Sequence, residues 1–146
     1  MAEPMTSETR SRIVSCLVVL VVIPIGLFAR AHRAGADPAT LLGFLSVYTG
    51  DTLWPIMFYF MAKFCSPQSR IISLLVFVLG LTLTLEFGQL VRSPTLDWLR
   101  KQPGIGFVLG STFIWSDVIC CTVGAAIAVA FDVVGRKWTA DARNWA

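Results

Sequence analysis

The sequence predicts an all-α polytopic membrane protein with four transmembrane helices, a short interfacial segment before the second helix and a polar loop before the fourth. Hydrophobic residues make up 55% of the 146 residues and charged residues only 14%, whereas soluble domains carry about 25% charged residues. The mean hydropathy is +0.71, and the apolar residues gather in four long runs separated by short polar segments. We therefore expect residues 1–146 to form a single transmembrane helical domain.

The charge pattern argues against a nucleic-acid-binding protein. The net charge is only +3, and the basic residues are scattered between apolar runs, as in the loops of a membrane protein. The cysteines lack zinc or redox spacing, so we expect them to be small packing residues without a disulfide. We also find no phosphate loop, Ser/His/Asp set or metal-ligand cluster in the sequence, and we expect no metal site and no cofactor.

The first apolar run, Ile13–Ala29, is about 17 residues or about 25 Å of helix, which is the short end of a membrane span. A cleaved signal peptide is the alternative, because Arg10 and Arg12 precede the run and Ala29-Arg30-Ala31 is similar to a cleavage site. The run is long for a signal peptide, so we favour a retained helix.

The second run, Leu41–Phe64, contains a polar interruption. The residues Thr49-Gly50-Asp51-Thr52 are typical of a helix break or N-cap. We therefore expect Thr40–Tyr48 to form a short interfacial helix and the span itself to begin near Asp51.

The third and fourth runs are Ile71–Val91 and Ser111–Val134, and the polar segment Arg92–Gly110, rich in Gly, connects them. A tight turn at Ser66-Pro67-Gln68 separates the second run from the third.

Two spacings in the fourth run predict helix contacts. Gly124 and Ala128 have the small-xxx-small spacing that lets another helix approach closely. Asp132 and Arg136 are four residues apart, so we expect them to form an ion pair at the end of the helix.

The positions of Lys and Arg favour an orientation with both termini in the cytoplasm. In that orientation seven of the 12 basic residues lie inside and five outside. The inner set consists of Arg10, Arg12, Lys63, Arg70, Arg136, Lys137 and Arg143.

Three acidic residues, Asp51, Glu86 and Asp117, lie inside or at the edge of apolar runs. A carboxylate in lipid is costly unless it is paired, protonated or facing a wet cavity. The helical rise places Asp51 about 18 Å from Lys63 and Glu86 about 9 Å from Arg92. Because alternate helices run in opposite directions, we expect all three acids near the face that holds the loop between the third and fourth runs.

Further polar and aromatic residues are expected at the same face. Gln89 follows Glu86 by three positions and shares its stripe, while Asp97 and Arg100 lie in the connecting loop. We predict a ligand-binding site that comprises Asp51, Trp54, Glu86, Gln89, Asp97, Arg100, Trp115 and Asp117. A structural alternative stays open, in which Asp51 caps its helix and Asp97 forms an ordinary i,i+3 pair with Arg100. No residue is assigned a catalytic role.

Four segments of the chain resemble a bacterial membrane family known as domain of unknown function 2809. They are Gly50-Asp51-Thr52-Leu53-Trp54, Glu86-Phe87-Gly88-Gln89-Leu90, Leu96-Asp97-Trp98-Leu99-Arg100 and Leu109-Gly110-Ser111-Thr112-Phe113-Ile114-Trp115-Ser116-Asp117. The resemblance runs from about Thr49 to Gly124, roughly half of the chain. It implies a small multi-span protein of the bacterial inner membrane with this same polar set, and it implies no established activity.

A more distant resemblance is to VanZ-like membrane proteins, which also pair a membrane Glu-x-x-Gln with a following loop Asp and a Gly-containing last span. Some of them are linked to glycopeptide resistance at the cell envelope. The sequence departs from their pattern around Asp51 and at Trp115-Ser116-Asp117.

Three functions remain open, all in the lipid bilayer. The first is a site for a polar or lipid-linked ligand at the outer face, where the acids bind it or move a proton. The second is an accessory or structural subunit of a larger membrane complex, in which the acids pair with Arg92, Arg100 or a partner. The third is an enzyme that uses two carboxylates as general acid and base, although the sequence offers no nucleophile or cofactor motif. We favour the first.

Overall fold

The computed structural model describes residues 6–32, 37, 39–102, 105, 109 and 113–144, with side chains described except at residue 30 and from residue 138 onward. This part of the chain is all-helical. Its elements are α1 (Ser7–Ala31), α2 (Leu41–Cys65), α3 (Ile71–Gly88), α4 (Pro94–Arg100) and α6 (Trp115–Asn144).

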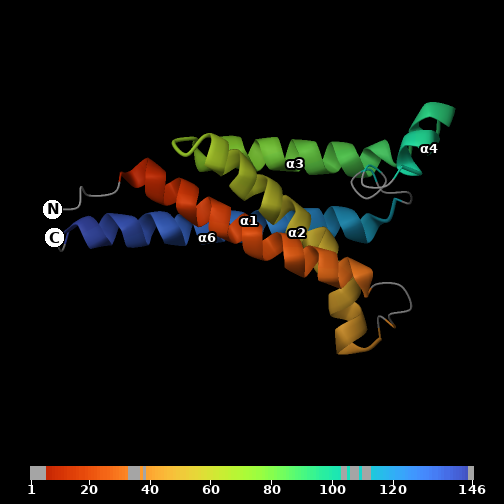
Figure 1. Ribbon diagram of the computed structural model, residues 1–146, viewed down its shortest axis with the longest axis horizontal. Coiled ribbons are helices and arrows are strands. Elements are labelled where there is room, and N and C mark those ends of the chain that lie inside the picture. Colours follow the sequence, from red (N-terminus) through yellow and green to blue (C-terminus); the bar gives the residue numbers. More distant parts are fainter. Residues whose placement is uncertain are drawn as a thin grey trace.

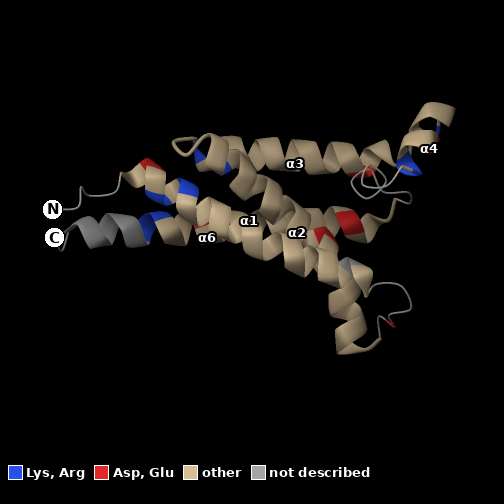
Figure 2. Cartoon of the chain, viewed as in Figure 1, with Lys and Arg blue, Asp and Glu red and all other residues tan. Residues whose placement is uncertain are grey.

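The four long helices run alternately up and down (Figure 1). The start of α1, the turn at residues 66–70 and the end of α6 lie at one end of the molecule, which we call the turn end. The end of α3, with α4 beyond it, lies at the opposite end, which we call the α4 end. Figure 2 shows Lys and Arg on several helices at the turn end, and Asp or Glu on α2 and α6 toward the α4 end.

Within the described residues, three helical segments are long and apolar enough to cross a membrane: Ser7–Ala29, Ile71–Gly88 and Trp115–Lys137. Their composition indicates a membrane-embedded protein. The prediction of four such spans is wrong for α2, because Asp51, Lys63 and the polar residues beside Asp51 lower its hydropathy. Instead, α2 is the central helix of the protein, since it packs against α1, α3 and α6.

The predicted interruption of α2 is also wrong. Leu41–Cys65 is one continuous helix, and its N-cap is Thr40, whose Oγ1 accepts a hydrogen bond from the Gly43 amide at 3.1 Å. Asp51 therefore does not cap a helix. The polar residues stay in the helix because their side chains can bond to its own backbone, as Thr52 Oγ1 does when it donates to Tyr48 O at 2.9 Å.

The other boundaries lie close to the apolar runs. Helix α3 ends at Gly88, slightly before the predicted Val91, and α6 begins at Trp115 and continues beyond Val134. The tight turn after α2 is confirmed at residues 67 and 68. The predicted polar loop contains α4, and much of its remainder lies outside the described residues.

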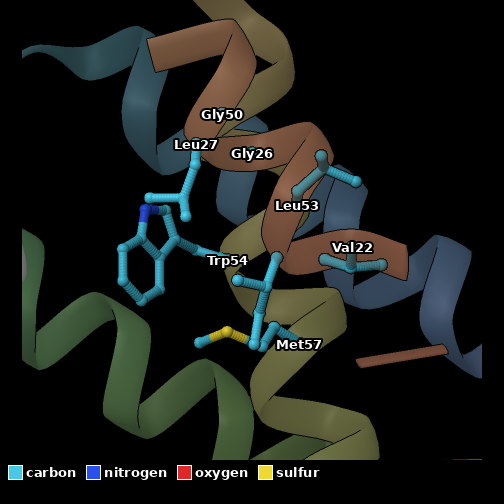
Figure 3. Close-up of a pocket in the computed structure, with 8 residues that line it drawn as sticks. Val22, Gly26, Leu27, Gly50, Leu53, Trp54 and Met57 are labelled. Carbon is cyan, nitrogen blue, oxygen red and sulfur yellow. The ribbon is translucent and has the colours of Figure 1, made fainter. Parts of the chain in front are cut away.

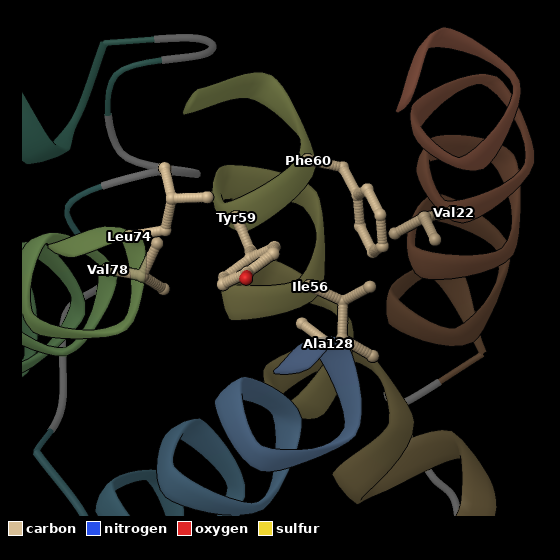
Figure 4. Packing of buried hydrophobic residues seen from close by; sticks show 7 residues of the cluster. All are labelled: Val22, Ile56, Tyr59, Phe60, Leu74, Val78 and Ala128. Atoms are coloured by element: carbon tan, nitrogen blue, oxygen red, sulfur yellow. The ribbon is translucent and has the colours of Figure 1, made fainter. Parts of the chain in front are cut away.

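The core joins all four long helices. Figure 4 shows the buried cluster, which consists of Val22, Ile56, Tyr59, Phe60, Leu74, Val78 and Ala128. The close helix approach predicted at Gly124 is confirmed, because a Cβ built there would lie 2.1 Å from Thr52 O of α2. Glycine at this position lets α6 contact the α2 backbone directly.

Candidate functional site

The last turn of α3 holds two of the predicted site residues together. Glu86 is half-buried, and its Oε2 accepts a hydrogen bond from Gln89 Nε2 at 3.0 Å. Gln89 is the C-cap residue of α3 and is only 7% exposed. The spacing of three residues therefore brings both side chains to one face, as the sequence predicts.

Helix α6 adds a thiol to this face. Cys121 is buried, and its Sγ donates to Glu86 Oε1 at 3.9 Å, a separation within the range for sulfur. Both Glu86 and Asp51 act electrostatically on the Cys121 thiol, so Asp51 of α2 lies near the same point.

One helical turn before Cys121, Asp117 is also buried, and its Oδ1 accepts from Ser116 Oγ at 3.1 Å. Residues four apart share one face of a helix, so Asp117 lies on the same side of α6 as Cys121. We call these five residues the acid group: Asp51, Glu86, Gln89, Asp117 and Cys121.

Arg100 fastens α4 to the end of α3. Its guanidinium donates to Gly88 O at 2.9 Å, to Val91 O at 3.1 Å and to Asp97 Oδ1 at 3.1 Å. Two of these bonds go to backbone carbonyls at the end of α3 and just beyond it, and the Gly88 carbonyl also accepts from the Val91 amide. Asp97 and Arg100 thus form the i,i+3 pair that the sequence left open, and the pair shapes the end of α3 beside the acid group.

The acid group presents mainly hydrogen-bond acceptors. It contains three carboxylates and the Gln89 amide oxygen, and this oxygen is buried without a hydrogen-bond partner among the described residues. Buried polar atoms in proteins almost always have partners. The arrangement is therefore suited to a molecule that brings hydroxyl or N–H donors.

The two tryptophans of the predicted site each make an aromatic contact. Trp54 pairs with Phe58 at 5.5 Å between ring centroids, and it lines a groove between α1 and α2. Figure 3 shows that groove, which is otherwise formed by Val22, Ile23, Gly26, Leu27, Gly50, Leu53 and Met57. Trp115 is 69% exposed and packs edge-on against Phe113, which stacks on Phe87 of α3. The ligand-binding role of all these residues stays a prediction.

A second polar cluster is centred on Asp132 of α6, and most of its contacts were not predicted from the sequence. Asp132 is 1% exposed. Its Oδ2 accepts from Tyr59 OH at 2.8 Å and from an Arg136 NH2 group at 3.1 Å, while its Oδ1 accepts from Lys63 Nζ and from Arg136 Nε at 3.1 Å. We call these four residues the ion cluster.

The predicted pair of Asp132 with Arg136 is confirmed at 3.1 Å, but its two further partners from α2 were not predicted. Lys63 was counted as a loop charge, whereas it is only 8% exposed. The available signal was the spacing of Tyr59 and Lys63, which places a phenol and an amine on one helix face. The cluster also reaches the turn at residues 66–70, because Arg136 donates to Ser69 O at 3.0 Å.

Comparison with known proteins supports one of the two resemblances. No solved structure matches this chain, and the likeness to VanZ-like proteins stays a prediction. Residues 40–125, more than half of the chain, match the family described as Protein of unknown function (DUF2809). The acid group lies wholly inside the matched residues, whereas Asp132 and Arg136 follow them. The chain belongs to the DUF2809 family.

Proposed function

We propose that the acid group binds the polar part of a small or lipid-linked molecule that carries hydroxyl or ammonium donors. The observation that carries this proposal is the side chain of Gln89. Its Nε2 is held by Glu86 at 3.0 Å, while its buried Oε1 has no partner among the described residues. An unpaired buried acceptor costs about 1–3 kcal/mol, so a ligand that donates to Oε1 would gain that energy on binding.

The surrounding charges favour the same class of ligand. Glu86 and Asp117 are further carboxylates of the acid group, and Arg100 directs its two terminal guanidinium nitrogens to Asp97 and to backbone carbonyls at the end of α3, while its buried Nε has no partner among the described residues. A phosphate or carboxylate would meet like charge at this point, which disfavours anions. A polyol or amine headgroup would meet mainly acceptors.

The location fits a molecule with an apolar tail. Except for Asp51 of α2, the acid group lies on or next to helices that are apolar enough to cross a membrane, toward their α4 end, so a headgroup bound there keeps its tail beside the apolar helix surfaces. The distribution of Lys and Arg predicts that this end faces away from the cytoplasm of a bacterial inner membrane.

The test is native mass spectrometry after extraction in mild detergent, with the wild type beside Glu86→Gln and Gln89→Met. We expect a donor-bearing species bound to the wild type to lose at least about tenfold in occupancy in both variants, which corresponds to about 1.4 kcal/mol. Glu8→Gln, the same kind of change at a half-buried position of α1 at the turn end, is the matched control and should keep the species. Retention in both site variants, or its absence from the wild type, would contradict the proposal.

One observation favours the alternative, an accessory subunit of a larger complex. Within the described residues, α1 packs on α2 and on no other helix. Large apolar side chains on its open side remain exposed, including Leu17 at 57%, Leu20 at 61% and Phe28 at 66%. A stoichiometric protein partner in the same spectra, lost when Leu20 is changed to Ala, would support this function instead.

A further inference from the structure

We propose a second binding site, for an anionic phospholipid, at the turn end of the molecule. It does not depend on the acid group. The site has two connected parts: a polar hollow between the start of α1 and the turn at residues 66–70, and an apolar groove between α2 and α3. Ser66 and Ser69 line both parts, so a headgroup in the hollow would continue directly into the groove.

The hollow offers donors suited to a phosphate. It is lined by Glu8, Arg12, Ser66, Pro67, Gln68 and Ser69. Glu8 is already engaged, because its Oε1 accepts from Gln68 Nε2, and this bond ties α1 to the turn. Arg12 is exposed and forms no ion pair with any described residue, which leaves its guanidinium available for the paired hydrogen bonds that arginine makes to phosphate.

Further cations border the hollow. Arg70 directly follows Ser69 and is the N-cap residue of α3. Arg136 donates to Ser69 O at 3.0 Å, and its side chain is 41% exposed. The ion cluster as a whole carries one net positive charge, because Lys63 and Arg136 face the single carboxylate of Asp132. The cations around the hollow therefore outnumber Glu8, and they favour an anionic headgroup over a zwitterionic one.

The groove has the length and lining of an acyl-chain site. Its apolar walls include Phe58, Ala62, Leu74, Phe77 and Leu81. From Ile71 to Leu81, α3 rises about 15 Å, which is half of the roughly 30 Å hydrocarbon thickness of a bilayer. The groove therefore extends from the membrane surface about as deep as one leaflet, as the chain of a phospholipid bound in the hollow would.

The first test measures the binding of phosphatidylglycerol to the detergent-solubilised protein by native mass spectrometry, with phosphatidylcholine as the zwitterionic comparison. Arg12→Gln should lower phosphatidylglycerol binding about fivefold, the effect of one basic residue near an anionic surface. Arg10→Gln is the matched control, because residues two apart point away from each other on a helix. It should change binding by less than about twofold, as expected for a distant screened charge.

The second test addresses the groove. Ser73 is exposed and lines it, so Ser73→Trp should fill the groove and reduce phosphatidylglycerol binding while the protein remains folded. Thr84→Trp, at an exposed position of α3 outside the groove, is the matched control. Glu86→Gln should leave phosphatidylglycerol binding unchanged, which separates this site from the proposed function of the acid group.

Three outcomes would overturn the proposal. Equal losses of phosphatidylglycerol binding in Arg12→Gln and Arg10→Gln would show that diffuse surface charge attracts the lipid and that there is no specific headgroup site. Equal binding of phosphatidylcholine and phosphatidylglycerol would remove the headgroup preference. Complete displacement of the lipid by glycerol 3-phosphate at equal concentration would identify a site for free phosphate without a chain groove.

Discussion

The ion cluster makes a quantitative prediction about stability. Asp132 accepts four hydrogen bonds, from Tyr59, Lys63 and Arg136. Asp132→Leu leaves Lys63, which is 8% exposed, without its carboxylate. We expect the free energy of unfolding to fall by about 3–5 kcal/mol, the usual cost of removing one partner of a buried ion pair. Lys63→Met should cost about 3 kcal/mol, the lower end of that range, because Asp132 keeps Tyr59 and Arg136.

A double variant distinguishes the interaction energy of Lys63 with Asp132 from the effects of the two single substitutions. When Lys63→Met and Asp132→Leu are combined, neither buried charge is left uncompensated, and Arg136 can turn toward solvent because its side chain is 41% exposed. Replacement of a buried ion pair by apolar residues is often close to neutral. We therefore expect the double variant to lose less than the sum of the single losses by at least about 1.5 kcal/mol.

The assay is unfolding in mixed micelles with rising dodecyl sulfate fraction, followed by tryptophan fluorescence and circular dichroism. Lys137→Met, at an exposed position one residue beyond Arg136, is the control and should change stability by less than about 0.5 kcal/mol. Losses that add within about 0.5 kcal/mol would show that Lys63 and Asp132 are not coupled. That result would refute our account of how α2 and α6 are held together.

Three further predictions concern helix contacts. Gly124→Leu should lower stability by about 3 kcal/mol in the same assay, because a Cβ there meets Thr52 O, whereas Gly80→Leu should be tolerated because a Cβ there has no neighbour within 4 Å. Equal effects would argue against the close approach of α6 to α2. Thr40→Ala should cost about 1 kcal/mol and speed amide exchange at residues 41–44, and Thr40→Ser should restore both. Arg100→Gln should speed amide exchange in the last turn of α3 but not in the middle of α6, and Arg100→Lys should not rescue it because lysine lacks the planar fork.

The extent of the helices was largely predictable from the sequence, because the length of an apolar run is a local property. The runs predicted α3 and the start of α6 to within a few residues. They predicted the start of α1 to within about two turns. Helix α2 was harder to predict, because its polar residues are typical of a helix boundary when the helices packed against it are not considered. The structure shows Asp51 near Cys121 of α6 and Lys63 bonded to Asp132 of α6, and neither relationship has a local sequence pattern.

In the two polar clusters as well, contacts within one helix were predictable, whereas contacts between helices were not. Glu86 with Gln89 and Asp97 with Arg100 were predictable contacts, because residues three apart share a helix face. The bond from Lys63 to Asp132 joins residues 69 positions apart. It depends on how two helices pack, so spacing along single helices could identify the Asp132 pair with Arg136 and the shared face of Tyr59 and Lys63, but not the contact between the two helices.

The position of the ion cluster has a consequence for the order in which the protein is assembled. Lys63 belongs to α2, whereas its carboxylate partner belongs to α6, which leaves the ribosome after α2, α3 and α4. A nascent chain that has released only α1, α2 and α3 therefore holds a lysine in its central helix with no counter-ion. Arrival of α6 supplies Asp132 and closes the bundle, so the charge of the central helix is neutralised only when α6 joins it. A chain that stops before α6 should accordingly be the form that membrane quality-control proteases remove.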